Sequence, residues 1–240
     1  MIDWLRGPAE DPVIEVGGRA LPLAIRRHAR AKRLTMRLAP DGSEVRVTLP
    51  RWCRTADALV FAHARSDWLE RQLAAVPRSE PPAPGGTLRY RGTELAIVWD
   101  TGHRRAPRLD GASLLVGGLQ QSLAVRLRRW LEKEAERLCA EDLAFYCARA
   151  GRSTPQIRLS RAQRRWGSCS DRATIRINWR LVQAPDHVRR SVVAHEVAHL
   201  AHFDHSPAFH AELARLYEGD IKAADRWLKE RGRELYAAFG

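Results

Sequence analysis

Short stretches of alternating apolar and polar residues fill the first half of the chain. The alternation over 34–38 resumes over 45–49 after the turn-forming Pro40-Asp41-Gly42, which predicts a β-hairpin. Further strand-like runs between 88 and 116 are separated by glycine-containing turns, and we expect them to pair antiparallel. A helical pattern over 55–76 separates these regions. The first half is therefore predicted to be an antiparallel, β-rich region with one helix.

The apolar spacing changes to three or four residues after 120. A long helix with Leu123, Leu127 and Leu131 on its apolar face is predicted to run to Ala150, with Gly151 as its terminator. The pattern beyond it predicts one strand and then three helices. The strand covers 172–179, and the helices end near Leu200, Tyr217 and Ala238, the last of them beginning at Trp227.

Together these patterns predict an α+β fold with two domains. We expect a β-rich domain over 1–118, which includes a Pro/Gly-rich loop at 77–86, and a mainly helical domain with a small sheet over 119–240. Hydrophobic residues make up 45% of the 240 positions, which is enough to fill cores without disulfides. Inspection of the sequence gives no internal repeat.

Composition indicates a soluble protein. No stretch approaches the roughly 20 apolar residues that a membrane-spanning helix needs, and Met1 to Glu10 lack an apolar signal-peptide core. The four cysteines show no CxxC spacing, as is usual in a reducing compartment. We therefore expect a cytoplasmic protein that has no membrane segment.

The chain is strongly basic, with 41 Lys and Arg against 28 Asp and Glu and a formal net charge of +13. Arginines gather over 26–33 and again over 161–165. A surface of this kind attracts polyanions, but no helix-turn-helix, RNP or zinc-finger signature accompanies it. A solvated basic surface and a nucleic-acid-binding surface both remain open.

Residues 195–199 read His-Glu-Val-Ala-His within a helical pattern. Four residues of helix turn through about 400°, so His195 and His199 project from one face, one turn apart. Neutral imidazole is a preferred ligand of Zn²⁺, and Glu196 lies beside the metal without being needed as a ligand. The motif predicts a zinc site with Glu196 as general base. The competing interpretation is a helix that carries two surface histidines and a glutamate.

A catalytic zinc site usually has three protein ligands and leaves its fourth position to water. His205 is the preferred third ligand because it follows the helix and precedes Ser206-Pro207, a typical helix start, so the chain can turn back. Four other residues nearby remain open as the third ligand: His202, Asp204, His210 and Glu212.

Several short motifs together resemble the YgjP-like metallopeptidases, which are related to the SprT-like proteases. They are Arg165-Trp166-Gly167-Ser168-Cys169-Ser170, Asn178-Trp179-Arg180-Leu181, Ala184-Pro185, the segment His195 to Leu200, His205-Ser206 and Phe209, with Arg30 to Leu34 and Trp68-Leu69 upstream. The resemblance implies a zincin-type catalytic domain, Zn²⁺ held by His195, His199 and His205, Glu196 as general base, and a polypeptide substrate. His210 departs from the family, which often has Trp after the Phe.

Zincins present the edge of a strand to an extended substrate. The strand over 174–178 precedes the metal helix, so we expect it to form the rim of the cleft, with Arg176 and Asn178 binding substrate. Trp166 is expected to shape the pocket. Two alternatives remain open: an interior strand with both edges paired, and a Trp166 that only packs in a turn.

The sequence thus predicts a zinc-dependent metallopeptidase. A zinc-stabilised nucleic-acid-binding protein without catalysis is the alternative from another class, although such a structural site normally has four ligands. A hydrolase of small amides would share the chemistry. Because SprT-like relatives act on proteins bound to DNA, a peptidase recruited to such proteins is a further alternative.

Overall fold

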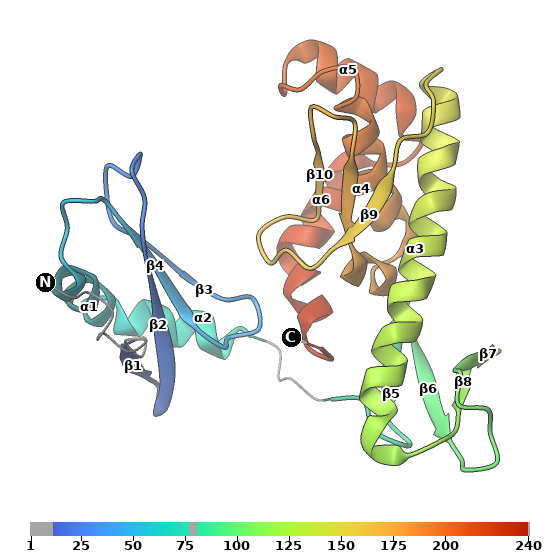
Figure 1. The fold of residues 1–240 in the computed structure, drawn as a ribbon, viewed down its shortest axis with the longest axis horizontal. Coiled ribbons are helices and arrows are strands. Elements are labelled where there is room, and N and C mark those ends of the chain that lie inside the picture. The colour runs from blue at the N-terminus through green and yellow to red at the C-terminus, as the bar shows by residue number, and fades with distance from the viewer. Residues whose placement is uncertain (1–11, 77–80, 240) are drawn as a thin grey trace, which may run out of the picture. The chain divides into compact units, whose positions relative to one another are not determined.

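The computed structural model describes residues 12–76 and 81–239, which belong to two compact units (Figure 1). The units divide between Arg78 and Ser79, whereas the sequence placed the domain boundary between 118 and 119. Six helices and three small sheets occupy the described ranges, so the predicted α+β class is confirmed. No helix in these ranges is both long enough and apolar enough to cross a membrane. Positions 1–10 and 77–80, which the sequence analysis discussed, lie outside the described residues.

The first unit is a four-stranded sheet with two helices. Its elements are β1 (Val13–Val16), β2 (Arg19–Arg27), β3 (Thr35–Leu38), β4 (Val45–Leu49), α1 (Thr55–His63) and α2 (Ser66–Ala74), and the strand order is β1-β2-β4-β3. Leu23, Val47 and Leu69 are fully buried between sheet and helices. The predicted hairpin is confirmed as β3 and β4. The single helix predicted over 55–76 is wrong, because the backbone leaves the helical conformation at Arg65 (φ −124°, ψ 22°).

The second unit begins with another four-stranded sheet. Its strands are β5 (Thr87–Tyr90), β6 (Thr93–Trp99), β7 (Arg108–Asp110) and β8 (Ser113–Val116), and they share a core with α3 (Leu123–Arg149). The expectation of purely antiparallel pairing is wrong, since β6 runs parallel to β8 and β2 runs parallel to β4. In each sheet the strand that comes between the two parallel strands in sequence, β3 or β7, occupies an outer edge. The next strand, β4 or β8, therefore pairs with β2 or β6 in the same direction.

These two sheets have the same topology. The order β5-β6-β8-β7 repeats β1-β2-β4-β3, with the same antiparallel and parallel pairings in the same places. Each first hairpin closes through two residues of positive φ, Gly17-Gly18 in one sheet and Arg91-Gly92 in the other. The two sheets therefore share a strand topology that no repeat in the sequence indicates.

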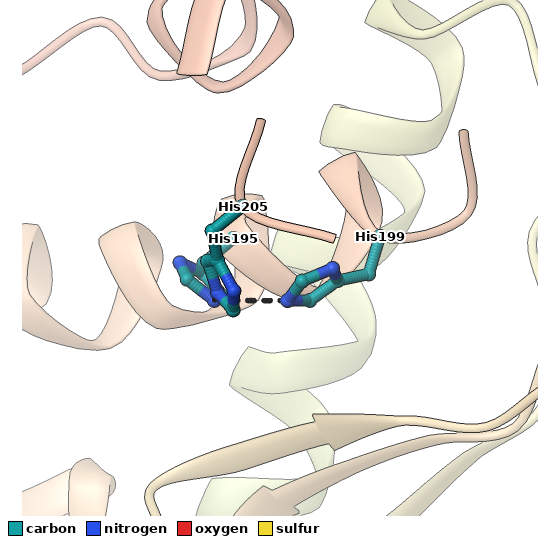
Figure 2. A group of neighbouring side chains, drawn as sticks. All are labelled: His195, His199 and His205. Atoms are coloured by element: carbon teal, nitrogen blue, oxygen red, sulfur yellow. Dashed lines mark hydrogen bonds between the residues drawn. The ribbon is translucent and has the colours of Figure 1, made fainter. Parts of the chain in front are cut away.

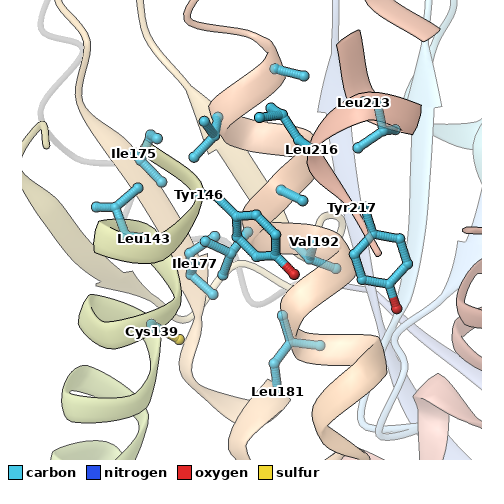
Figure 3. Packing of buried hydrophobic residues seen from close by; sticks show 14 of the residues in the cluster. Cys139, Leu143, Tyr146, Ile175, Ile177, Leu181, Val192, Leu213, Leu216 and Tyr217 are labelled. Carbon is cyan, nitrogen blue, oxygen red and sulfur yellow. The ribbon is translucent and has the colours of Figure 1, made fainter. Parts of the chain in front are cut away.

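The rest of the second unit contains a three-stranded sheet and three helices. The strands β9 (Ile157–Ser160), β10 (Gly167–Cys169) and β11 (Ile175–Asn178) lie in the order β10-β11-β9, and the helices are α4 (Asp186–Ala198), α5 (Pro207–Leu216) and α6 (Ile221–Arg231). Figure 3 shows the core, where Tyr146, Ile177 and Leu213 meet from α3, β11 and α5. A buried ion pair, Arg189 Nε to Asp142 Oδ2 at 2.8 Å, also joins α4 to α3.

The predicted helices fit this region with one correction. The long helix and the helix that begins at Pro207 are confirmed as α3 and α5. The last helix begins at Ile221 instead of Trp227, because the Asp220 side chain accepts a hydrogen bond from the Ala223 N–H and caps α6 there. Residues 232–236 continue as a 3₁₀ helix.

Candidate metal centre

His195 and His199 come from the last turn of α4 and its C-cap. Their Nε2 atoms lie 3.1 Å apart (Figure 2). The Nδ1 atom of His199 lies 2.9 Å from the carbonyl oxygen of His202, and since a carbonyl can only accept, Nδ1 donates and Nε2 is the nitrogen that faces His195. Burial, together with the neighbouring imidazoles of His199 and His205, lowers the pKa of His195 to about 4. The ring of His195 is therefore neutral near pH 7, as a metal ligand must be.

His205 completes a triad of imidazoles. After α4 the chain turns back, and His205 Nε2 lies 3.3 Å from His195 Nε2. One ring nitrogen from each of the three histidines lies within 4.8 Å of the others. The turn ends where the Ser206 hydroxyl caps α5 by accepting from the Phe209 N–H, with Pro207 in the first turn, as the sequence predicted. The structure thus assembles the three residues that the sequence proposed as ligands.

The other third-ligand candidates have different surroundings. Glu212 accepts hydrogen bonds from Arg215 at 2.9 and 2.8 Å, and these bonds lower its pKa. His202 contributes its backbone carbonyl to His199. The ring of His210 lies 6.5 Å from that of His205, centre to centre. Among the described residues, the group suited to a metal ion contains none of these and not Asp204.

Phe209 forms a common wall for the three imidazoles. Its fully buried ring stacks on His199 with centroids 4.5 Å apart, and lies 4.9 Å from His195 and 4.8 Å from His205. These contacts restrict the rotation of all three rings. In the sequence Phe209 stands out only as part of the family pattern, because nothing local indicates that it touches all three histidines.

We expect Phe209→Leu to weaken metal binding about 10- to 100-fold, because groups that orient metal ligands typically contribute that much. Competition with a chelator would measure the change. Phe203→Leu is the matched control, since Phe203 is 61% exposed in the same turn. Equal metal affinity in both variants, with both folded by circular dichroism, would show that Phe209 does not orient the imidazoles.

Glu196 lies on α4 between the two histidines and is 5% exposed. Burial raises the pKa of Glu196 to about 7, and the nearby Arg165 partly offsets this. Its Oε2 atom has no hydrogen-bond partner among the described residues, which is unusual for a buried carboxylate oxygen. Such an oxygen is available to a water molecule or a substrate.

Gly167 on β10 makes room for that carboxylate. A Cβ atom at this position would lie 2.3 Å from Glu196 Oε1 and 2.7 Å from its Cγ, far inside van der Waals contact. Gly167 has no positive φ, so it is the missing side chain, and not backbone freedom, that the site uses. Gly167 falls within the motif Arg165 to Ser170, but nothing in the sequence predicts this role.

A cavity of about 230 Å³ opens beside Glu196. Its walls come from β10 and the segment before it, from α4, α5 and α6, and are formed by Trp166, Gly167, Ser191, Val192, His195, Glu196, Leu213, Ile221, Asp225 and Leu228. Trp166, expected to shape the pocket, does line it, and its ring also packs near Tyr236, with centroids 5.9 Å apart.

The other two expected substrate contacts lie elsewhere. Asn178 is fully buried, donates to the Ala162 carbonyl at 2.7 Å and accepts from the Arg180 N–H at 3.1 Å. Arg176 stands between the buried Ile175 and Ile177 and therefore points away from the α4 side of the sheet. The strand itself is central, paired with β10 and β9, so the predicted edge over 174–178 is wrong. The edge on the Glu196 side is β10.

Comparison with known protein families supports the assignment of a metal site. The histidine triad is an arrangement suited to a metal ion, and the family model of the YgjP-like metallopeptidase domain matches residues 32–231. The chain belongs to the YgjP-like metallopeptidase family, which confirms the resemblance seen in the sequence and implies a metal ion.

The similarity to solved structures is low. The crystal structure of the metallopeptidase zymogen of Pyrococcus abyssi abylysin is similar over 41% of this chain and 96% of that one, with 19% identity and a TM-score of 0.34. No curated protein matches the chain.

Proposed function

We propose that the chain is a zinc-dependent peptidase in which His195, His199 and His205 hold the ion and Glu196 is the general base. The observation that carries the proposal is the convergence of three imidazole nitrogens beside a buried carboxylate oxygen that has no partner among the described residues. A structural zinc site normally has four protein ligands, whereas three leave a position open for chemistry. This difference favours catalysis over the non-enzymatic alternative.

The spacing of the nitrogens suits zinc. Two nitrogen ligands at 2.0–2.1 Å from a tetrahedral ion lie about 3.3–3.4 Å apart. The observed separations from His195 Nε2, 3.1 Å to His199 and 3.3 Å to His205, are close to that value. An all-nitrogen donor set is also more typical of zinc than of magnesium or calcium, which prefer oxygen.

Glu196 would move the protons of the reaction. Bound zinc supplies Lewis acidity that activates a water molecule and polarises the substrate carbonyl. The carboxylate of Glu196 accepts a proton from the attacking water and passes it to the departing amine. Gly167 supports this role because it lets the carboxylate lie directly against β10.

The free side of β10 is our proposed rim for the substrate backbone. In the order β10-β11-β9, β10 has a strand partner on one side only within the described part of the chain. An extended peptide could pair with the backbone of Gly167 to Cys169, which gives affinity with little dependence on sequence. This strand replaces the one over 174–178 that the sequence suggested.

The remaining alternatives stay predictions. Hydrolysis of small amides would use the same groups, and only substrate tests separate it from peptidase activity. Nucleic-acid binding through the arginine clusters, including recruitment to DNA-bound proteins, is open to measurement by the salt dependence of binding. A cytoplasmic location likewise remains an expectation.

Metal content tests the proposed site. We expect about one zinc per chain, and its loss in His199→Ala and in His205→Ala, because each removes a ligand. His202→Ala is the matched control, since His202 supports His199 through its backbone carbonyl, which alanine retains. Elemental analysis of the four purified proteins after zinc reconstitution gives the answer. Zinc retained in His205→Ala would remove that residue from the ligand set, and no zinc in the parent would overturn the proposal.

A further inference from the structure

The cavity beside Glu196 is small. Its volume of about 230 Å³ is below the range of roughly 300–1,000 Å³ typical of pockets for drug-sized ligands. Because it reaches the Glu196 carboxylate, it lies next to the place where a substrate bond would be broken. We therefore expect the side chain of a substrate residue next to the cleaved bond to occupy the cavity.

Most of the cavity wall is apolar. Val192 comes from α4, Leu213 from α5, and Ile221 and Leu228 from α6. Such a wall would accommodate the methylene groups of a long side chain. The Ser191 hydroxyl donates to the Val188 carbonyl at 2.8 Å, so its hydrogen is already used within α4.

Two carboxylates line the cavity. They belong to Glu196 and Asp225, and among the described lining residues there is no Lys or Arg. The proposed metal ion, beside His195, and Arg165 would both act on Glu196. Asp225, one helix away on α6, is therefore the carboxylate left to attract a cationic group of the substrate.

Asp225 occupies a defined position on the cavity wall. It is one turn from Ile221 and from Leu228, so the three side chains share a face of α6. The Asp220 cap fixes the start of this helix. Asp225 itself is exposed and makes no hydrogen bond or ion pair with another described residue. Its carboxylate is available to a ligand.

We propose that this cavity is a specificity pocket for a lysine or arginine side chain that flanks the cleaved bond, with Asp225 as the group that recognises the cation. The methylene groups of such a side chain would contact the apolar wall while its charged end reaches Asp225. This inference rests on the proposed peptidase function and adds to it the chemical class of the substrate residue.

Paired peptides test the pocket. Quenched fluorescent peptides would carry lysine or norleucine, which lacks the ammonium group, at either position flanking the bond, and the zinc-loaded full chain would cleave them. For one of the two positions we expect kcat/KM to be about tenfold higher with lysine, the size of effect expected for a charge-assisted hydrogen bond. Asp225→Asn should remove this difference by lowering kcat/KM for the lysine peptide. Asp225→Lys should instead favour a matched peptide that carries glutamate at that position.

Glu230→Gln is the matched control, because Glu230 is another exposed carboxylate of α6 that does not line the cavity. It should keep the preference for lysine. Peptide affinity measured by calorimetry on the Glu196→Gln variant, with and without Asp225→Asn, provides a readout that does not need turnover.

The outcomes separate the two proposals. Cleavage of lysine and norleucine peptides at equal rates, or a lysine preference that survives Asp225→Asn, would overturn the pocket assignment and leave the peptidase intact. Failure of the zinc-loaded wild type to cleave any peptide or unfolded protein would overturn the proposed function. If calorimetry in that case also shows no lysine preference, the pocket assignment falls with it.

Discussion

Glu196→Gln should retain zinc and lose at least about 100-fold, and up to about 10,000-fold, of peptidase kcat, the range attributed to a positioned general base. Glutamine keeps the shape of the buried side chain but cannot accept the proton of the attacking water. Because Glu196 lies outside the nitrogen triad, the metal site itself should be unchanged. Elemental analysis and steady-state cleavage of an unfolded protein such as casein would be measured on the same preparation.

The control for this experiment is Glu212→Gln. Glu212 follows the triad on α5, but its carboxylate is bound to Arg215, so its loss should leave both zinc and turnover near those of the wild type. A Glu196→Gln variant with more than a tenth of the wild-type kcat would remove the residue from the role of general base. Loss of zinc in that variant would instead indicate that Glu196 helps to hold the metal.

Gly167→Ala is expected to reduce turnover at least about tenfold while zinc stays bound. The added methyl group would lie 2.3 Å from Glu196 Oε1, so either the carboxylate or β10 must move. A displacement of about 1 Å at a reacting group is enough to cost on the order of 100-fold in rate. The His195, His199 and His205 nitrogens do not depend on Gly167, and zinc content reports on them separately.

Ser168→Ala is the matched control for Gly167→Ala. Ser168 is the next residue of the same strand, so its side chain points to the opposite face of the sheet. Circular dichroism and thermal unfolding would be compared for both variants, because an overpacked site can also lower stability. Full activity in a folded Gly167→Ala protein would show that the contact between β10 and Glu196 is dispensable.

The histidine triad could be predicted because its information is local. The spacing of His195 and His199 is set by one helical turn, and the start of α5 at Pro207 places His205 close behind them. The long helix α3 was equally visible because its apolar period continues over many turns. Where a pattern repeats along the chain, or a cap residue marks an end, sequence is sufficient.

The proposed substrate side of the site could not be predicted in the same way. The edge strand β10 has three residues, Gly-Ser-Cys, which show no alternation of apolar and polar positions. Residues 174–178 alternate clearly, but alternation tells which faces are buried and not which edges are paired. The α6 wall of the cavity, with Asp225, is brought to Glu196 only by tertiary packing. Because α6 is far from Glu196 in the sequence, no local pattern predicts this contact.

The shared strand order of the two four-stranded sheets is followed by two different continuations of the chain. The sheets match in pairing directions and in a two-residue first turn, but the connection between their last two strands spans 39–44 in one and 111–112 in the other. Two nine-residue helices follow the first sheet, and the 27-residue helix α3 follows the second. That longer helix carries Asp142, which binds Arg189 of the histidine-bearing α4. The same sheet topology thus ends one unit with short helices and, in the other, leads into the helix that anchors the histidine triad.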